Sequence, residues 1–241
     1  MRTLGVIPAR WGSTRFEGKV LAVIQGKPMI QHVWESAKKC RRLSDVLIAC
    51  DDKRILDAAA AFGATAVMTS PKHTSGTDRI AEAVRSLKAD IVVNIQGDEP
   101  LIQPKVIDDL VLGLQRDRTC VMATVIKAIE NPKDLSNPNV VKVVVDIDGT
   151  AIYFSRSCIP YDRDQKAFGQ VPYYKHLGLY AYRKDFLMQF NKLPKSLLER
   201  TEHLEQLRVL EAGFKIKTVE TDIETIGVDT PEDLVRVAKV L

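Results

Sequence analysis

Short runs of consecutive apolar residues recur along the first half of this chain, each followed by a loop and a helix-like pattern. The clearest runs span positions 4–7, 46–50 and 91–95. Strands that are apolar on both faces are buried on both faces, which is typical of parallel sheets. Between these runs, positions 28–37 and 55–62 carry apolar residues at helical spacing. The pattern predicts an α/β fold with a mostly parallel sheet and helices on both faces.

A basic, glycine-containing loop follows the first apolar run. We expect the first strand to end at Pro8, because proline has no N–H to donate to a sheet. The loop after it carries three cations, Arg10, Arg15 and Lys19, and two glycines. Turned backbone N–H groups and positive side chains suit a polyphosphate, although a solvated basic loop is the alternative. The spacing fits neither a P-loop nor a dinucleotide fingerprint, so any metal ligands must come from elsewhere in the chain.

Composition narrows the class of protein and of ligand. The chain has 241 residues, 45% of them hydrophobic, and a formal net charge of +4, which fits one large α/β domain. The small, scattered positive excess favours an anionic small molecule and argues against nucleic acid. Four well-separated cysteines without a C-x-x-C pair are typical of reduced cytoplasmic thiols. With no leader-like or membrane-spanning run, we expect a cytoplasmic protein without a membrane partner.

Two acidic residues lie where an open α/β sheet would bind a ligand. Asp98 follows the third apolar run, and ligands of such sheets lie beyond the carboxyl ends of the strands. Asp229 directly precedes a strong helix start. Together in space they would form a two-carboxylate Mg²⁺ site, whereas each alone is a turn residue. Ser75 with Asp78 resembles a capping box, which predicts a helix whose N-terminus faces a polar or anionic ligand.

The sequence pattern changes in the second half of the chain. Positions 140–154 hold two apolar stretches around a turn-forming Asp-Gly pair, which is a hairpin signal. We therefore expect an inserted antiparallel subdomain at residues 129–178, with a role in sugar binding and dimerisation. The core would comprise residues 1–128 and 179–241. Because projecting ribbons often pair subunits, we expect a homodimer. Positions 197–212 predict one continuous helix with most of its charged residues on a solvent-facing side.

Motifs along the whole chain together resemble the 3-deoxy-manno-octulosonate (Kdo) cytidylyltransferases, a family of sugar-acid cytidylyltransferases. The motifs are IPAR at 7–10, STR at 13–15, GK at 18–19, TSGTDR at 74–79, NIQGDEP at 94–100, YFSR at 153–156, HLGLYAY at 176–182 and GVDTPEDL at 227–234. No motif is decisive alone, but the ordered set is specific. The resemblance implies a Rossmann-like fold of the nucleotide-diphospho-sugar transferase type. It also implies an enzyme that couples CTP and Kdo to CMP-Kdo and pyrophosphate with Mg²⁺, for lipopolysaccharide synthesis.

Carried over residue by residue, the resemblance implies a role for each motif. The triphosphate would be held by Arg10, Ser13, Arg15 and Lys19. The nucleotide would also contact Pro8, Ala9, Ser75, Gly76, Arg79 and Gln96. Mg²⁺ would be bound by Asp98 and Asp229, which with Arg10 and Lys19 would carry the catalysis. Kdo would face Arg156, His176, Tyr180, Glu205 and Gln206, with Arg156 pairing with its carboxylate. The anomeric hydroxyl of Kdo would then attack the α-phosphorus of CTP.

Three other functions compete with this reading. A cytidylyltransferase for another sugar acid, such as an acylneuraminate, differs only on the acceptor side. A non-catalytic nucleotide-binding regulator would be expected to lack Lys19 or one of the two carboxylates, yet all are present. A GT-A glycosyltransferase is disfavoured because positions 98–100 do not form the D-x-D motif that such enzymes carry at a strand end.

Overall fold

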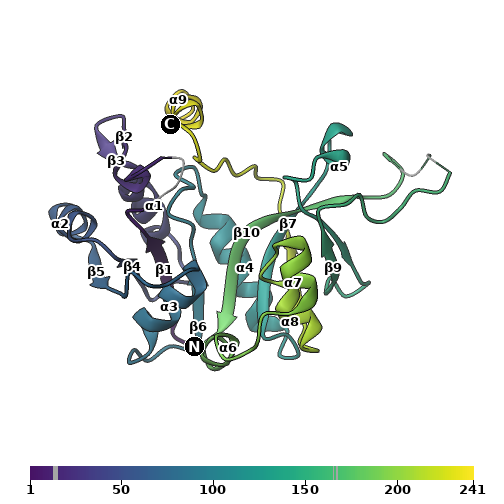
Figure 1. Cartoon of the computed structure of the whole chain (residues 1–241), viewed down its shortest axis with the longest axis horizontal. Coiled ribbons are helices and arrows are strands. Elements are labelled where there is room, and N and C mark those ends of the chain that lie inside the picture. Colours follow the sequence, from purple (N-terminus) through teal and green to yellow (C-terminus); the bar gives the residue numbers. More distant parts are fainter. Residues whose placement is uncertain (13–15, 165, 167) are drawn as a thin grey trace.

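Nine strands form one mixed sheet in this computed structural model, which describes residues 1–12, 16–164, 166 and 168–241. The strands are β1 (Thr3–Ala9), β4 (Asp45–Cys50), β5 (Thr65–Met68), β6 (Ile91–Asn94), β7 (Met122–Ala128), β8 (Lys142–Val145), β9 (Ala151–Ser155), β10 (Tyr174–Arg183) and β11 (Ile216–Glu220). The main path of the sheet runs β11-β7-β10-β6-β1-β4-β5 (Figure 1). A separate two-stranded ribbon pairs β2 (Val23–Ile24) with β3 (Lys27–Pro28).

The strands on the β5 side of the sheet, from β6 to β5, are all parallel, and β11 is parallel to β7. Strand β10 is the exception in the middle, since it runs antiparallel to both β6 and β7. The predicted α/β fold with a mostly parallel sheet is therefore confirmed. Within the described residues, no helix is long and apolar enough to cross a membrane.

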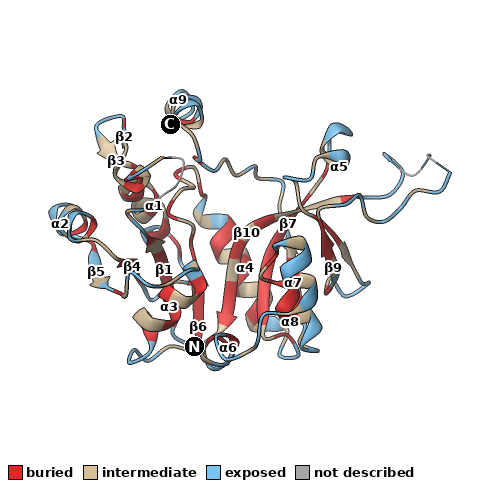
Figure 2. Ribbon diagram, viewed as in Figure 1, coloured by how far each residue is buried: buried red, intermediate tan, exposed pale blue. Residues whose placement is uncertain are grey.

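Helices cover both faces of the sheet, as the apolar runs predicted. They are α1 (Met29–Lys38), α2 (Lys53–Ala61), α3 (Gly76–Val84), α4 (Pro104–Arg116), α5 (Lys133–Ser136), α6 (Lys184–Phe190), α7 (Leu197–Glu202), α8 (Leu207–Glu211) and α9 (Pro231–Ala238), with a 3₁₀ turn η1 (Lys19–Leu21). Successive residues of β1 face opposite layers: Ile7 joins the core under α1, α2 and α4, and Val6 joins the core under α3, α6 and α8. The central strands are accordingly buried (Figure 2).

The first strand does not end at Pro8 as predicted, and continues to Ala9. The carbonyl of Val6 accepts the N–H of Ile95 on the β6 side. Pro8 lies two residues further along and faces the same side. Strand β6 has already ended there, at Asn94 opposite Val6. The missing N–H of Pro8 therefore costs no ladder hydrogen bond. Beyond Val6, β1 is paired with β4 alone.

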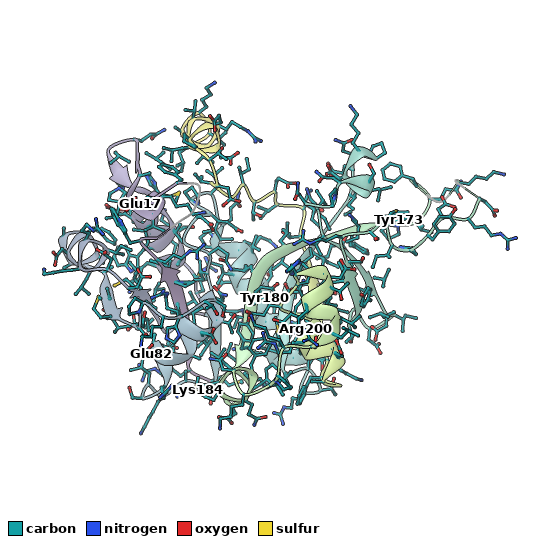
Figure 3. All side chains as sticks on the ribbon, in the orientation of Figure 1. Glu17, Glu82, Tyr173, Tyr180, Lys184 and Arg200 are labelled. Atoms are coloured by element: carbon teal, nitrogen blue, oxygen red, sulfur yellow. The ribbon has the colours of Figure 1, made fainter. Side chains whose placement is uncertain are left out.

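The predicted hairpin is present as β8 and β9, but it belongs to the main sheet. Strand β8 pairs with β9 on one side and with the first residues of β10 on the other. Strand β10 therefore begins inside the predicted insertion, 129–178, and ends in the core segment, so the two parts share a strand. The described residues between β9 and β10 project away from the sheet (Figure 1). Tyr173 lies at the base of this projection (Figure 3).

The continuous helix predicted over positions 197–212 is wrong. The backbone breaks at His203, whose φ of 53° is left-handed, and two short helices, α7 and α8, result. The break lets Arg208 turn inward, where its Nε donates to Glu199 at 2.7 Å. The side chains of Arg208 and Glu199 are only 9% and 10% exposed. A buried ion pair between the two helices thus replaces the solvent-facing charges that we expected.

Candidate active site

A cavity of about 300 Å³ opens at the carboxyl ends of β1 and β6. It is lined by Pro8, Arg10, Lys19, Val20, His73, Thr74, Ser75, Gly76, Arg79, Gln96, Gly97, Asp98 and Asp229. Seven of the residues predicted to bind the nucleotide are among them: Pro8, Arg10, Lys19, Ser75, Gly76, Arg79 and Gln96. Ala9 is fully buried in β1 and does not line the cavity. Ser13 and Arg15 lie outside the described residues.

Two local structures place the walls of this cavity. Ser75 caps α3 by accepting the N–H of Asp78 at 3.1 Å, as predicted, which turns the first N–H groups of the helix towards the cavity. On the opposite side, the chain leaving β6 passes so close to β1 that a Cβ at Gly97 would lie 3.0 Å from the carbonyl oxygen of Pro8. Glycine therefore lets Asp98 reach the mouth of the cavity.

Lys19 links the two carboxylates that were predicted to bind a metal. Its Nζ lies 2.7 Å from Asp98 Oδ2 and 2.9 Å from Asp229 Oδ1, and it also donates to the carbonyl oxygen of Val228 at 3.0 Å. Burial alone would lower the pKa of Lys19, but the two carboxylates outweigh it and raise that pKa above its ordinary value. Lys19 is therefore a firmly charged ammonium between Asp98 and Asp229.

Oxygen atoms from two distant parts of the chain thus converge on one cation. Carboxylate and carbonyl oxygens are the donors that Mg²⁺ prefers. Among the described residues, no three His, Cys, Asp or Glu side chains form a group that could hold a metal. Asp98 and Asp229 are a pair, which suits Mg²⁺ because this ion usually takes one or two carboxylates and completes its shell with water and phosphate oxygens. The chemistry of this donor set fits the predicted ion.

A buried ion pair joins the basic loop to α3. Asp51, which follows β4, accepts the N–H of Trp11 through Oδ1 at 2.9 Å and the guanidinium of Arg79 through Oδ2 at 2.8 Å. Arg79 also donates to the hydroxyl of Thr69 at 2.6 Å, and its side chain is 4% exposed. Arg79 thus lines the cavity while most of its guanidinium is held inside the protein.

Three of the predicted sugar-binding residues are linked by direct contacts. The rings of His176 and Tyr180, both on β10, lie 5.4 Å apart, and the hydroxyl of Tyr180 donates to Gln206 at 3.3 Å. Tyr180 lies near the centre of the molecule (Figure 3). Gln206 is 3% exposed, and its Nε2 has no partner among the described residues. An unpartnered, buried amide donor of this kind suits a polar ligand.

Two hydrogen bonds connect β10 and Glu205 to the segments that form the cavity. Gln96, in the cavity wall, donates to the carbonyl oxygen of Gly178 at 2.9 Å. Gly178 lies in an irregularity of β10 between Leu177 and Tyr180, and such bulges redirect side chains next to active sites. On the other side, the hydroxyl of Thr77 in α3 donates to Glu205. Burial raises the pKa of Glu205, an effect that the hydrogen bond from Thr77 opposes.

Arg156 lies apart from the cavity lining. Its Nε donates to the carbonyl oxygen of Glu202 at 2.8 Å, and its Nη1 donates to that of Pro138 at 2.9 Å. The backbone N–H of Arg156 is held by the carboxylate of Glu202. These bonds connect β9 to α7. None of the five predicted sugar-binding residues lines the cavity. The structure links His176, Tyr180 and Gln206 to one another, joins Glu205 to α3 through Thr77, and holds Arg156 at the hairpin.

A family model described as cytidylyltransferase matches residues 4–219. A 3-deoxy-manno-octulosonate cytidylyltransferase from Solibacter usitatus is 55% identical over 238 residues, covering 99% of this chain and 94% of the relative. Another from Geotalea daltonii is 52% identical and covers 98% and 97%. The chain belongs to the 3-deoxy-manno-octulosonate cytidylyltransferase family. The predicted resemblance is confirmed.

A solved structure of a CMP:2-keto-3-deoxy-manno-octonic acid synthetase complexed with CTP has the same fold as this cytidylyltransferase. It superposes with a TM-score of 0.95 at 45% identity, covering 100% of this chain and 98% of that one. The fold class predicted from the sequence is thereby confirmed through the length of the chain.

Sequence reasoning missed several residues around the site of this cytidylyltransferase. Asp51 was given no role in the site, although it directly follows β4, a buried strand beside β1. That position is the signal that could have identified it. Thr77 was quoted within a motif without a role, and His73, which lines the cavity, was not identified. Glu99 is the fourth, since burial and the neighbouring Asp98 carboxylate raise its pKa to about 7.

Proposed function

We propose that this protein transfers the cytidylyl group of CTP to Kdo, giving CMP-Kdo and pyrophosphate. The observation that carries the proposal is one cavity that combines Arg10, Lys19, the capped start of α3 and the pair Asp98 and Asp229. Cations and helix N–H groups suit a triphosphate, and the carboxylates suit the cation that accompanies it. Membership of the family supports CTP and Kdo as the two substrates.

The nucleotide side of the reaction requires charge stabilisation. Negative charge builds on the phosphate oxygens and on the leaving pyrophosphate, and Arg10, Lys19 and Arg79 are cations that line the cavity. Arg79 is already paired with Asp51, so Arg10 and Lys19 are the two that we assign to the phosphates. Ser13 and Arg15 would add to this set. Gln96 and Arg79 would contact the base or the ribose from opposite walls. Together these groups hold the triphosphate so that its α-phosphorus faces the acceptor.

Mg²⁺ is the cofactor that we propose, held by Asp98 and Asp229. When bound, it supplies positive charge beside the phosphate oxygens and lowers the pKa of the attacking hydroxyl. Lys19 marks the point where a cation is stabilised by both carboxylates.

The acceptor side is assigned to the predicted sugar-binding residues. The polar groups of His176, Tyr180 and Gln206 would bind the hydroxyls of Kdo, and Glu205 would accept a hydrogen bond from a further hydroxyl. Arg156 would pair with the carboxylate of the sugar by turning its guanidinium from the carbonyls that hold it here. The Kdo hydroxyl oxygen bonds to the α-phosphorus, the bond to the β-phosphate oxygen breaks, and pyrophosphate leaves while the hydroxyl proton passes to solvent.

Pyrophosphate release tests this function directly. The protein is supplied with CTP, Mg²⁺ and one of Kdo, N-acetylneuraminate or no sugar. Release with Kdo alone is expected. Release with N-acetylneuraminate alone would keep the nucleotide half of the proposal and replace its acceptor with another sugar acid. Tight CTP binding without release for any sugar would instead favour the nucleotide-binding regulator.

We further propose a homodimer built on the hairpin and the neighbouring projection, working in the cytoplasm in lipopolysaccharide synthesis. Large apolar side chains are exposed there: Ile152 is 59% exposed, Tyr161 82% and Val171 48%. Burying such side chains is favourable, so a second copy of the chain is a natural partner. Light scattering should give the mass of a dimer for the natural chain and of a monomer for Ile152→Asp. A monomeric natural chain would contradict this assembly.

A further inference from the structure

The side chain of Lys19 has no donor to spare for a phosphate. An ammonium carries three N–H donors. Those of Lys19 are matched by Asp98 Oδ2, Asp229 Oδ1 and the carbonyl oxygen of Val228, all within 3.0 Å of Nζ. Its side chain is 14% exposed. A triphosphate can therefore gain Lys19 as a partner only if Lys19 gives up at least one of these oxygens.

The two carboxylates are held together independently of Lys19. The backbone N–H of Val228 donates to the backbone carbonyl oxygen of Asp98 at 2.9 Å, which joins the two segments beside their carboxylates. Asp229 then enters α9 through the capping box formed by Thr230 and Asp233. Removing the ammonium would leave two carboxylates facing one point, where their mutual repulsion strengthens the attraction for any other cation.

The backbone at Lys19 is fixed by its neighbour. Gly18 is left-handed, with a φ of 67°, and a Cβ there would lie 2.7 Å from the ring of Trp11. The N–H of Gly18 also donates to the carbonyl oxygen of Trp11 at 3.0 Å. A move of Lys19 from the carboxylates to a phosphate is therefore a rotation of its side chain and not a shift of the loop.

We propose that Lys19 and a divalent cation compete for the same carboxylate oxygens of Asp98 and Asp229, and that a nucleotide triphosphate relieves the competition by drawing the ammonium away. A divalent ion placed beside Lys19 would meet a like charge at close range, which opposes its binding. Once the phosphates take Lys19, the carboxylates are released for the metal. Binding of nucleotide and binding of metal then favour each other through one side chain. This inference rests on the carboxylate pair of the proposed function.

The test is metal binding without nucleotide or sugar. Mn²⁺ is titrated calorimetrically into the natural chain, into Lys19→Met and into Lys105→Met. Lys105→Met makes the same change in net charge as Lys19→Met. It is a control for position, because Lys105 is an exposed residue of α4 outside the cavity. Lys19→Met should bind Mn²⁺ about tenfold more tightly than the natural chain, within the usual range of coupling between sites. Lys105→Met should match the natural chain. Equal or weaker binding by Lys19→Met, or no binding by any of them, contradicts the proposal.

A measurement on the natural chain keeps the proposal testable if Lys19→Met does not fold. With ¹⁵N-labelled lysine, the ammonium protons of Lys19 should be protected from exchange by their three acceptors and visible by NMR. Saturating Mg²⁺ should remove that signal. A signal that persists unchanged means that Lys19 and the metal do not compete.

The outcome is independent of the acceptor sugar. A chain that proves to act on another sugar acid would leave these binding results in place. Asp98→Asn provides the separate check on the metal assignment, since unchanged Mn²⁺ affinity in that variant would mean that the metal binds elsewhere and that the proposed cofactor site is wrong.

Discussion

Arg79 donates to Asp51 Oδ2 at 2.8 Å, and the other oxygen of the same carboxylate accepts the backbone N–H of Trp11 at 2.9 Å. One carboxylate, only 12% exposed, thus joins the two walls of the nucleotide cavity, the basic loop after β1 and the first turns of α3. The spacing between the cations of the loop and the N–H groups of the helix depends on this contact.

Asp51→Ala should lower the free energy of unfolding by about 3–5 kcal/mol, because it leaves the charge of Arg79 buried without a negatively charged partner. Denaturant unfolding measures this loss. Asp51→Asn preserves the shape of the side chain and should be more stable than Asp51→Ala. It should still raise the KM for CTP, with little change in the KM for Kdo. The neighbouring Asp52→Asn is the matched control, since Asp52 caps α2 and pairs with the exposed Arg54 but lies outside the cavity lining, and asparagine caps equally well. Equal effects at both positions would contradict the role given to Asp51.

Lys19→Ala should reduce kcat by about 10²–10³, because it removes one cation from the charge that develops on the phosphates. Asp98→Asn should cost as much or more, since it removes a proposed metal ligand. Steady-state pyrophosphate release measures both. A rate near that of the natural enzyme for either variant would rule out this mechanism.

The pKa of His176 is lowered from 6.5 to about 3 by burial, so the folded protein holds this ring neutral. Below a pH of about 6.5 the unfolded chain takes up a proton there that the folded chain does not. Stability is therefore lost as the pH falls from about 6.5 towards about 3, and is unaffected by this residue above that range. Urea unfolding of His176→Gln should show a shallower loss over the same interval. Parallel curves for the two proteins would refute the burial of a neutral histidine.

Glu205→Gln should raise the KM for Kdo by about 10–100-fold, the usual range for a hydrogen bond to a charged group, with the KM for CTP nearly unchanged. Glu205 already accepts from Thr77, so Thr77→Val should shift the KM for Kdo in the same direction by disturbing the orientation of the carboxylate. Glu130→Gln serves as the control, since Glu130 is exposed and pairs only with Lys127 among the described ion pairs. A raised KM for CTP instead would move Glu205 to the nucleotide side.

Elements set by local patterns were predictable from the sequence. The strand around Ile48 is apolar throughout, and Ser75 and Thr230 cap α3 and α9 with their own side chains. The errors arose where a distant part of the chain decides the outcome. Pro8 remains in β1 because β6 ends early beside it. The backbone break at His203 accompanies the ion pair between Glu199 of α7 and Arg208 of α8, which no local pattern reveals.

The residues of the candidate site likewise divide into those that a local pattern predicts and those that only the folded chain brings together. The strand-end rule pointed to Asp98, and the helix start after Asp229 suggested the second carboxylate, which the family resemblance also implied. Nothing in the spacing of these residues indicated that Lys19 would lie between them, because the contact joins three segments that only the folded sheet brings together. Asp51 was missed for a different reason, since a carboxylate before a helix has a sufficient local explanation as a cap.

The most direct test of the central claim is the identity of the product. With CTP, Kdo and Mg²⁺, ³¹P NMR should show the three CTP signals replaced by one phosphodiester signal and one pyrophosphate signal, and only when Kdo is present. CTP that remains intact beside Kdo, or that yields pyrophosphate and free CMP without a phosphodiester, would contradict the assignment of this chain as the enzyme that makes CMP-Kdo.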